Sequence, residues 1–223
     1  MIQTIAFVPA RSGSKRLKDK NRLQIGGISL IRRTLMLLGD VGFNKIVLST
    51  NNKEYFCEAE GLDVSFELRN ADLSNDFATT SEVLLEWLDR SRISDDTIIF
   101  LWQVTSPFRT HRLLTDFIER AKLLKQGEML MCVSRTSKIS QMGLDDLVSP
   151  IDYSFGTRSQ DVNSILVKEN GLGYAITAKT LRIEQTLFPS RVISFPTNSY
   201  CLDLDIDEER DYIIAKTLLE NGI

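Results

Sequence analysis

The feature that most restricts the fold of this chain is the alternation of short apolar runs with longer amphipathic runs. Short runs rich in Ile, Val, Leu and Phe, bounded by polar or turn residues, predict strands at Thr4–Val8, Lys45–Ser49, Val64–Phe66, Thr97–Trp102 and Met129–Val133. Helical spacing of apolar residues predicts helices between them, at Ser29–Leu38, Lys53–Glu60, Thr80–Arg90 and His111–Lys125. We therefore expect an α/β fold with a mostly parallel sheet flanked by helices. Ligands in such folds bind beyond the carboxyl ends of the strands.

A polar stretch from about Ser134 to Asn170 interrupts this alternation. A connection of that length in a compact domain is usually functional or takes part in contacts between subunits. After it, strands are predicted at Tyr174–Thr177 and Arg191–Phe195, and a closing helix at Glu208–Leu219. The sequence has no internal repeat, so we expect a single domain over residues 1–223, with an insertion at about 135–170.

Several classes of protein are disfavoured by composition. The formal net charge is −3, which argues against a general nucleic-acid binder. No C-x-x-C pair occurs among the three cysteines, Cys57, Cys132 and Cys201, so we do not expect a zinc or dithiol site. We expect a reduced, cytoplasmic setting. No apolar run approaches the roughly 18 residues of a membrane span, and Ile5–Val8 is too short for a signal peptide. The single histidine, His111, begins a predicted helix, and we assign it no catalytic role.

A basic loop follows the first predicted strand. Five cations lie within residues 11–20, around a Ser-Gly-Ser turn: Arg11, Lys15, Arg16, Lys18 and Lys20. Gly13 allows the backbone to curl so that several amides face one point, and such a concavity suits a polyphosphate. The loop matches neither G-x-x-x-x-G-K-[ST] nor G-x-G-x-x-G. The alternative is a solvated basic turn, which its place after the first strand of an alternating fold disfavours.

A carboxylate cluster lies near the C-terminus, at Asp203, Asp205 and Asp207. Alternate residues of an extended strand project to the same side, so we expect these three to share a face. Clustered carboxylates repel one another unless a cation compensates, and Mg²⁺ (or Mn²⁺) bound to carboxylates and phosphate oxygens fits this need. Asp207 is alternatively the N-cap of the helix predicted from Glu208.

Together the motifs resemble one family, the CMP-sialic acid synthetases and their relatives for legionaminic, pseudaminic and keto-deoxy-octulosonic acids. Pro9-Ala-Arg-Ser-Gly-Ser-Lys15 with Lys20-Asn21 looks like their nucleotide-binding loop. Similar motifs follow in the family's order: Arg69–Asp76, Gln103–Arg109, Thr157–Asp161, Lys168–Gly171 and Asp203–Asp211. Asn70 and Val104 stand where the family has proline.

The resemblance implies a Rossmann-like nucleotidyltransferase fold and a set of site residues. It places CTP at Ala10, Arg11, Ser14, Lys15, Lys20, Asn21 and Arg69, with Arg69 reading the cytosine ring. It places a nine-carbon sugar acid at Gln103, Arg158, Lys168 and Asn170, and metal at Asp205 and Asp207. Arg11, Lys20, Asp205 and Asp207 are then the catalytic residues. It further implies a homodimer, in which residues near 135–170 form the interface and reach the partner's site.

The expected reaction is transfer of CMP from CTP to the anomeric hydroxyl of a nonulosonic acid, with release of pyrophosphate. Three alternatives stay open: an enzyme for pseudaminic, legionaminic or keto-deoxy-octulosonic acid, one for a sugar phosphate, and a non-catalytic nucleotide-binding module. Thr157–Asp161 resembles the pseudaminic and legionaminic acid enzymes as much as the sialic acid enzymes. Neither nucleic acid nor membrane is expected as a partner.

Overall fold

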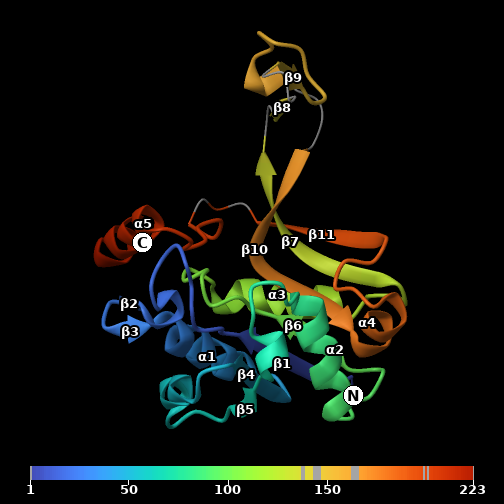
Figure 1. Ribbon diagram of the computed structural model, residues 1–223. Helices are drawn as coiled ribbons and strands as arrows, with labels where there is room; N and C mark the ends of the chain where they lie inside the picture. Colours follow the sequence, from blue (N-terminus) through green and yellow to red (C-terminus); the bar gives the residue numbers. More distant parts are fainter. Residues whose placement is uncertain are drawn as a thin grey trace.

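A seven-stranded sheet forms the centre of the molecule (Figure 1). The computed structural model describes residues 2–136, 139–142, 147–161, 166–197, 199 and 201–222. The strand order is β11-β7-β10-β6-β1-β4-β5. The strands are β1 (Thr4–Pro9), β4 (Lys45–Thr50), β5 (Ser65–Leu68), β6 (Ile98–Leu101), β7 (Glu128–Thr136), β10 (Leu166–Thr177) and β11 (Arg191–Thr197).

The sheet is mostly parallel, as predicted. Strand β1 pairs in parallel with β4 and β6, β4 with β5, and β11 with β7. Strand β10 runs antiparallel to both of its neighbours, β6 and β7. A mixed sheet of this kind is common among large α/β sheets.

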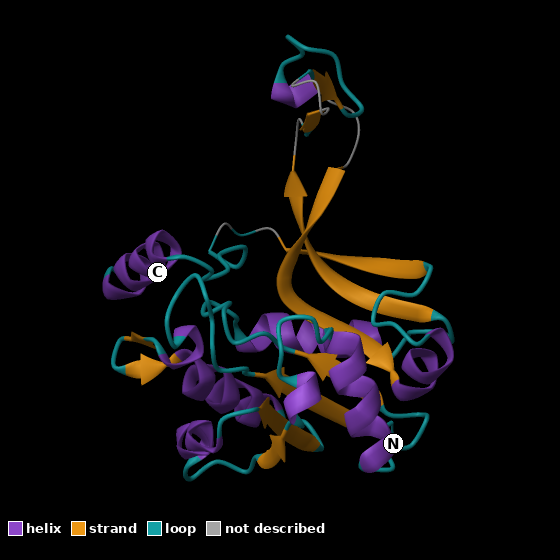
Figure 2. Ribbon diagram, viewed as in Figure 1, coloured by secondary structure: helices purple, strands orange, loops and turns teal. Residues whose placement is uncertain are grey.

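Helices cover both faces of the sheet (Figure 2). They are α1 (Leu30–Val41), α2 (Thr80–Arg90), α3 (His111–Ala121), α4 (Ala178–Glu184) and α5 (Glu209–Glu220). Side chains of β1 alternate between two cores: Ala6 and Val8 pack in the core with α1 and α3, and Ile5 and Phe7 in the core with α2 and α4. Period-two alternation of a strand buried on both faces therefore produces the three layers.

Some predicted elements differ in kind or length. Residues Lys53–Ala59 form a 3₁₀ helix, η2, where an α-helix was expected. Helix α3 ends at Ala121, four residues before the predicted boundary. The predicted strand at Tyr174–Thr177 is the end of the much longer β10. Helix α4 was not predicted, and its seven residues are too few to show a clear helical period.

The stretch that interrupts the alternation is more regular than expected. Strands β7 and β10 extend through its ends and pair with each other as far as Thr136 and Leu166. Beyond them, β8 (Ser140–Met142) and β9 (Val148–Pro150) form a small antiparallel pair that stands away from the sheet (Figure 1). Residues 137–138, 143–146 and 162–165 lie outside the described part. The dimer interface assigned to this insertion stays a prediction. No helix of the described ranges has the length and apolar character needed to cross a bilayer.

Candidate active site

A cavity of about 260 Å³ lies at the carboxyl ends of the parallel strands. Three loops line it: the basic loop after β1, the loop after β5 and the loop after β6. The first contributes Arg11, Ser14, Lys20 and Asn21, the second Arg69, Asn75 and Asp76, and the third Gln103, Val104 and Thr105. This is the place where open α/β sheets bind their ligands.

Hydrogen bonds from neighbouring loops hold the basic loop in its curl. The amide of Ser12 donates to Asn51 Oδ1 at 2.8 Å, and its hydroxyl donates to the same oxygen at 3.1 Å. Buried Asn21 donates to the carbonyl of Arg11 at 2.8 Å, and Ala10 N donates to the carbonyl of Ser49 at 2.8 Å. Gly13 turns the chain at a φ of 87°, a conformation that glycine adopts without strain.

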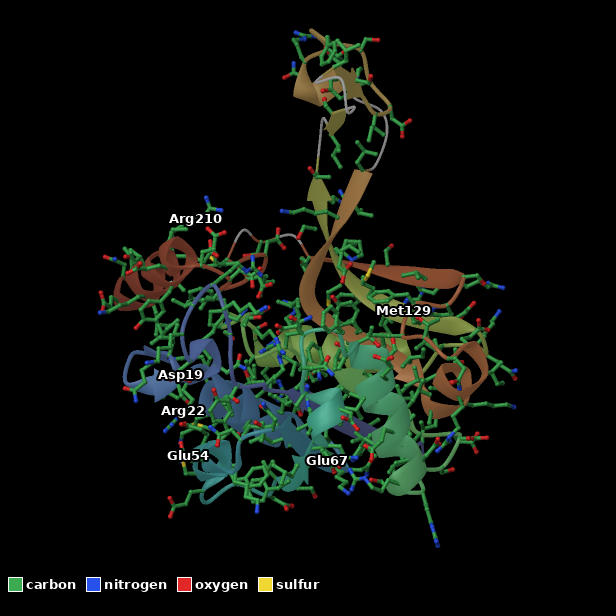
Figure 3. The ribbon with its side chains drawn as sticks, in the orientation of Figure 1. Asp19, Arg22, Glu54, Glu67, Met129 and Arg210 are labelled. Atoms are coloured by element: carbon green, nitrogen blue, oxygen red, sulfur yellow. The ribbon has the colours of Figure 1, made fainter. Side chains whose placement is uncertain are left out.

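The far end of the loop is also anchored. Figure 3 shows Asp19 and Arg22 near Glu54 of η2. Arg22 Nε donates to Glu58 Oε1 of η2 at 2.9 Å. The cations between these anchors therefore sit on a backbone held at both ends.

The carboxylate of Asp76 holds two of the loop's cations. Arg11 Nη1 lies 2.8 Å from Asp76 Oδ1, and Lys15 Nζ lies 2.5 Å from Asp76 Oδ2. The hydrogen bonds from Lys15 and Arg11 hold the pKa of Asp76 below its usual range. Asp76 closes the Arg69–Asp76 motif, but its position in the sequence alone does not predict a role for it.

The C-terminal carboxylates reach the same loop. Lys20 Nζ lies 2.8 Å from Asp207 Oδ1, and Arg16 Nη2 lies 2.9 Å from Asp207 Oδ2. A second hollow of about 230 Å³ is lined by Arg11, Ser14, Lys15, Arg16, Leu17, Lys20, Asp76 and Asp207. Burial acts to raise the pKa of Asp207, but Lys20 and Arg16 outweigh it and hold the pKa low. The cations and the acid thus lie at one site.

The prediction of a strand around the three aspartates is wrong. Residues 201–207 form turns and irregular chain, not a strand, so Asp203 does not share a face with the others. Its Oδ1 instead accepts from Thr197 Oγ1 at 2.9 Å and from Asn170 Nδ2 at 3.3 Å. Asp207 is not the N-cap of α5 either, because the cap is Glu208. The irregular chain is tied to the loop after β6 through Ile206 N and Thr105 O at 2.9 Å.

The environment of Asp205 favours a bound cation. Its Oδ1 is buried without a hydrogen-bond partner in the described part of the chain, which is costly unless a ligand satisfies it. Burial raises the pKa of Asp205. The Thr105 side chain acts against this effect, and the nearby charge of Asp207 acts with it. Among the described residues no group of three or more His, Cys, Asp and Glu could hold a metal. A metal here would therefore rest on two carboxylates and on ligand oxygens, which is the usual manner of Mg²⁺.

Arg69 lines the cavity and is held by Ser49. Its Nε donates to Ser49 Oγ at 2.9 Å and its Nη2 to Ser49 O at 3.2 Å. Burial, with a smaller effect of Arg11, lowers the pKa of Arg69 to about 10, so it stays charged at neutral pH. A guanidinium held at one edge presents its remaining donors in a fixed direction.

The four residues predicted to bind the sugar are not brought together in one chain. Gln103 lines the cavity. Asn170 is buried, and its Nδ2 donates to Ser134 Oγ, Thr197 Oγ1 and Asp203 Oδ1. Lys168 is exposed on β10. Arg158 lies in the insertion and does not line the cavity, and its Nε lies 2.7 Å from Asp161 Oδ2.

Comparisons with known proteins agree with this geometry. A family model described as cytidylyltransferase matches residues 5–191. The chain is 29% identical to an N-acylneuraminate cytidylyltransferase of Escherichia coli O18:K1:H7, over 96% of this chain and 51% of that protein. It is 29% identical to a CMP-N,N'-diacetyllegionaminic acid synthase of Legionella pneumophila, over 98% of this chain and 97% of that protein. The chain spans about half the length of the N-acylneuraminate enzymes that it matches.

Solved structures support the fold. A CMP:2-keto-3-deoxy-manno-octonic acid synthetase complexed with CTP superposes with a TM-score of 0.72 at 14% identity, covering 99% of this chain and 100% of that one. A 4-diphosphocytidyl-2C-methyl-D-erythritol synthase of Anaerococcus prevotii superposes with a TM-score of 0.70 at 14% identity, over 98% and 96% of the two chains. Since the family model covers most of the sequence and the cavity carries the family's motifs, the chain belongs to the cytidylyltransferase family.

Proposed function

We propose that this protein transfers CMP from CTP to the anomeric hydroxyl of a nonulosonic acid and releases pyrophosphate. The observation that carries the proposal is the meeting of the basic loop with Asp207 at the second hollow, which shares Arg11, Ser14, Lys20 and Asp76 with the first. Enzymes that activate sialic, legionaminic and pseudaminic acids are among the relatives of the chain. Both their activity and their substrates come to this chain as part of the proposal.

The basic loop supplies the electrostatics of the reaction. The anomeric oxygen attacks the α-phosphorus of CTP, a bond forms between them, the bond from the α-phosphorus to the bridging oxygen breaks, and the hydroxyl proton passes to solvent. Negative charge then grows on the departing pyrophosphate. Arg11, Ser14, Lys15 and Lys20 lie where they can donate to these oxygens. Donors fixed in place before the reaction stabilise such charge without reorganisation.

Different residues would bind the nucleotide base and the metal. Arg69 and Asn21, which line the cavity, would contact the nucleotide together with Ala10, with Arg69 at the cytosine ring. Gln103, also in the lining, would contact the acceptor. Asp205 and Asp207 would hold Mg²⁺ or Mn²⁺, as the unpartnered Asp205 Oδ1 fits. When bound, the ion neutralises charge on phosphate oxygens and lowers the pKa of the attacking hydroxyl. The protein's own residues position both substrates for in-line attack.

The cations predicted to bind the acceptor carboxylate are not among the residues that line the cavity of this chain. Arg158 and Lys168 are the predicted ones, and both lie outside it. We therefore include in the proposal a homodimer in which the insertion of one protomer reaches the cavity of the other. A bidentate contact from Arg158 to the carboxylate would then be strong and directional.

The proposal is tested with a panel of acceptors and nucleotides. The purified protein is incubated with Mg²⁺ and each of CTP, UTP, ATP and GTP, together with N-acetylneuraminic, legionaminic, pseudaminic or keto-deoxy-octulosonic acid or a sugar 1-phosphate. Pyrophosphate release is measured. We expect release with CTP and at least one nine-carbon acid. Release only with a sugar phosphate, or CTP binding by calorimetry without turnover for any acceptor, would contradict the proposal.

A further inference from the structure

Strand β10 carries an irregular segment near Gln103, one of the residues that line the cavity. Glu169 pairs with Val133 and Tyr174 pairs with Met131, so five steps along β10 oppose two steps along β7. The register shift is that of a large β-bulge, in which some backbone groups lose their partners in the ladder. Because this segment is buried, those groups need other partners.

Two side chains supply partners for Leu172, at the centre of the bulge. Arg109 Nη1 donates to the carbonyl of Leu172 at 3.1 Å. The amide of Leu172 donates to Asn170 Oδ1 at 3.2 Å. Leu172 itself is 1% exposed, so water does not replace these contacts. Side chains therefore hold the backbone of Leu172, at the centre of the bulge, between the paired residues Glu169 and Tyr174.

The bulge sits directly against the site because two of its residues are glycine. A Cβ on Gly173 would lie 2.2 Å from the ring of Trp102, too close to be accommodated. A Cβ on Gly171 would lie 3.5 Å from Asp205 Oδ2 and 3.9 Å from Gln103 Oε1. The backbone of Gly171 thus lies one methyl group away from van der Waals contact with the predicted metal ligand and the predicted acceptor contact.

A buried arginine is an unusual donor to a backbone carbonyl such as that of Leu172. Arg109 is 7% exposed, and in the described ranges no carboxylate lies within ion-pair distance of it, although the charge of Asp205 acts on it from farther away. Arg109 Nη2 donates to Thr34 Oγ1 of α1 at 2.9 Å. The guanidinium carbon also lies over the ring of Trp102, 5.8 Å from its centroid. Burial of an unpaired charge is costly. The planar fork compensates, because one side chain joins α1 to the bulge in fixed geometry.

We propose that Arg109 is a positioning residue of the transferase: by holding the carbonyl of Leu172 it fixes the bulge of β10 and, through Gly171, the places of Asp205 and Gln103. The kinetic consequence rests on the proposed function. The structural consequence does not, because it concerns the backbone of β10.

Arg109→Lys and Thr34→Val form the first test pair. Lysine keeps the charge but cannot reach both acceptors, whereas Thr34→Val removes only the contact on α1 and leaves the carbonyl of Leu172 bound. We expect both variants to lower Tm. We expect Arg109→Lys alone to lower kcat per folded molecule, by about 10–100-fold, as small displacements of reacting groups do. Its CTP affinity, measured by calorimetry with EDTA, should stay within about twofold of wild type, because the phosphate and base contacts lie elsewhere.

A second pair protects the test against a variant that does not fold. Gly171→Ala and Gly61→Ala replace glycines at φ values of 70° and 78°, so both carry the same backbone strain. Only the Cβ at 171 has neighbours within 4 Å. We expect Gly171→Ala to raise the KM of the acceptor and to lower kcat, and Gly61→Ala to change Tm alone.

Amide hydrogen exchange of peptides from residues 166–177 and Mn²⁺ titration by electron paramagnetic resonance give readouts independent of turnover. We expect faster exchange and weaker Mn²⁺ binding in Arg109→Lys, and neither in Thr34→Val. Equal exchange, equal Mn²⁺ binding and equal kcat per folded molecule in the two variants would overturn the inference. A wild-type protein that forms no product with any acceptor would refute the proposed function instead, and exchange with Mn²⁺ binding would still decide the role of Arg109.

Discussion

Lys20 Nζ lies 2.8 Å from Asp207 Oδ1, although the two residues are 187 positions apart in the chain. The pair joins the loop after the first strand to the residue just before the last helix. Lys20 is 17% exposed and Asp207 is 36% exposed, so the contact lies at the rim of the cavity and not in the core. A ligand with both phosphate oxygens and a metal would meet the two partners together.

Asp207→Asn tests the metal assignment. The amide keeps the shape of the side chain but loses its charge, so we expect the Mg²⁺ concentration for half-maximal rate to rise about 10–100-fold. Stability should change by less than about 1 kcal/mol, since pairs of partly exposed charges contribute little. Asp116→Asn is the matched control, because Asp116 forms a surface ion pair on α3. An unaltered Mg²⁺ response in Asp207→Asn would remove Asp207 from the metal site.

Arg11→Ala tests the basic loop. Arg11 lines both hollows, and loss of a donor to a developing charge typically lowers kcat by about 10²–10³-fold. The ion pair with Asp76 is partly exposed, so we expect Tm to change little. Lys18→Ala in the same loop is the control, since Lys18 lines neither hollow. Equal rates for the two variants would show that Arg11 is only one charge of a solvated turn.

Much of the fold could be predicted because its signals are local. The apolar runs of β1, β4 and β6 are buried on both faces, and the period of α2 gave its two ends at Thr80 and Arg90. The antiparallel direction of β10 was not predictable, because a short apolar run such as Tyr174–Thr177 carries no sign of its direction. The strands of the insertion could not be predicted, because exposed strands lack a regular alternation of apolar and polar residues.

The site was predictable in its residues more than in its geometry. Ordered motifs placed Arg11, Lys20 and Asp207 together, and the structure brings them to one cavity. The alternate spacing of the three aspartates predicted a strand. In the structure, however, Asp203 accepts hydrogen bonds from Asn170 and Thr197. Such long-range hydrogen bonds leave no periodic signal in the sequence. The roles of Asp76 and Arg109 likewise depend on partners that only the fold reveals.

Arg69→Lys tests the reading of the base. Lysine keeps a positive charge but has no planar fork, and it loses the two contacts by which Ser49 orients Arg69. We expect the ratio of kcat/KM for CTP over UTP to fall about tenfold, which is about 1.4 kcal/mol of discrimination. The ratio is measured by pyrophosphate release with both nucleotides. An unchanged ratio together with a lower rate would mean that Arg69 serves the phosphates and not the base.

Asp76 makes the link between two loops sensitive to acid. Its pKa is held low by Lys15 and Arg11, so its folded value lies below its unfolded value of about 3.9. A group of this sign stabilises the protein above the unfolded pKa, and the effect is lost as pH falls through the folded pKa. We expect the Tm of wild type to exceed that of Asp76→Asn near neutral pH, and the difference to shrink progressively as pH falls below about 3.9. A difference that persists in acid would assign the effect to packing and not to the charge.

Mixing two inactive variants tests whether the insertion acts across a dimer. Arg158 does not line the cavity of its own chain, and in the proposed dimer it would contact the acceptor bound at the partner's site. Arg11→Ala spoils the cavity, and Arg158→Ala spoils the insertion. If the insertion of one protomer serves the cavity of the other, a mixed dimer contains one site with both residues intact. Random reassembly of equal amounts in a twofold dimer should then restore about a quarter of wild-type activity. Addition of the two residual activities alone, after reassembly has been verified by mass, would place Arg158 outside catalysis or within its own subunit.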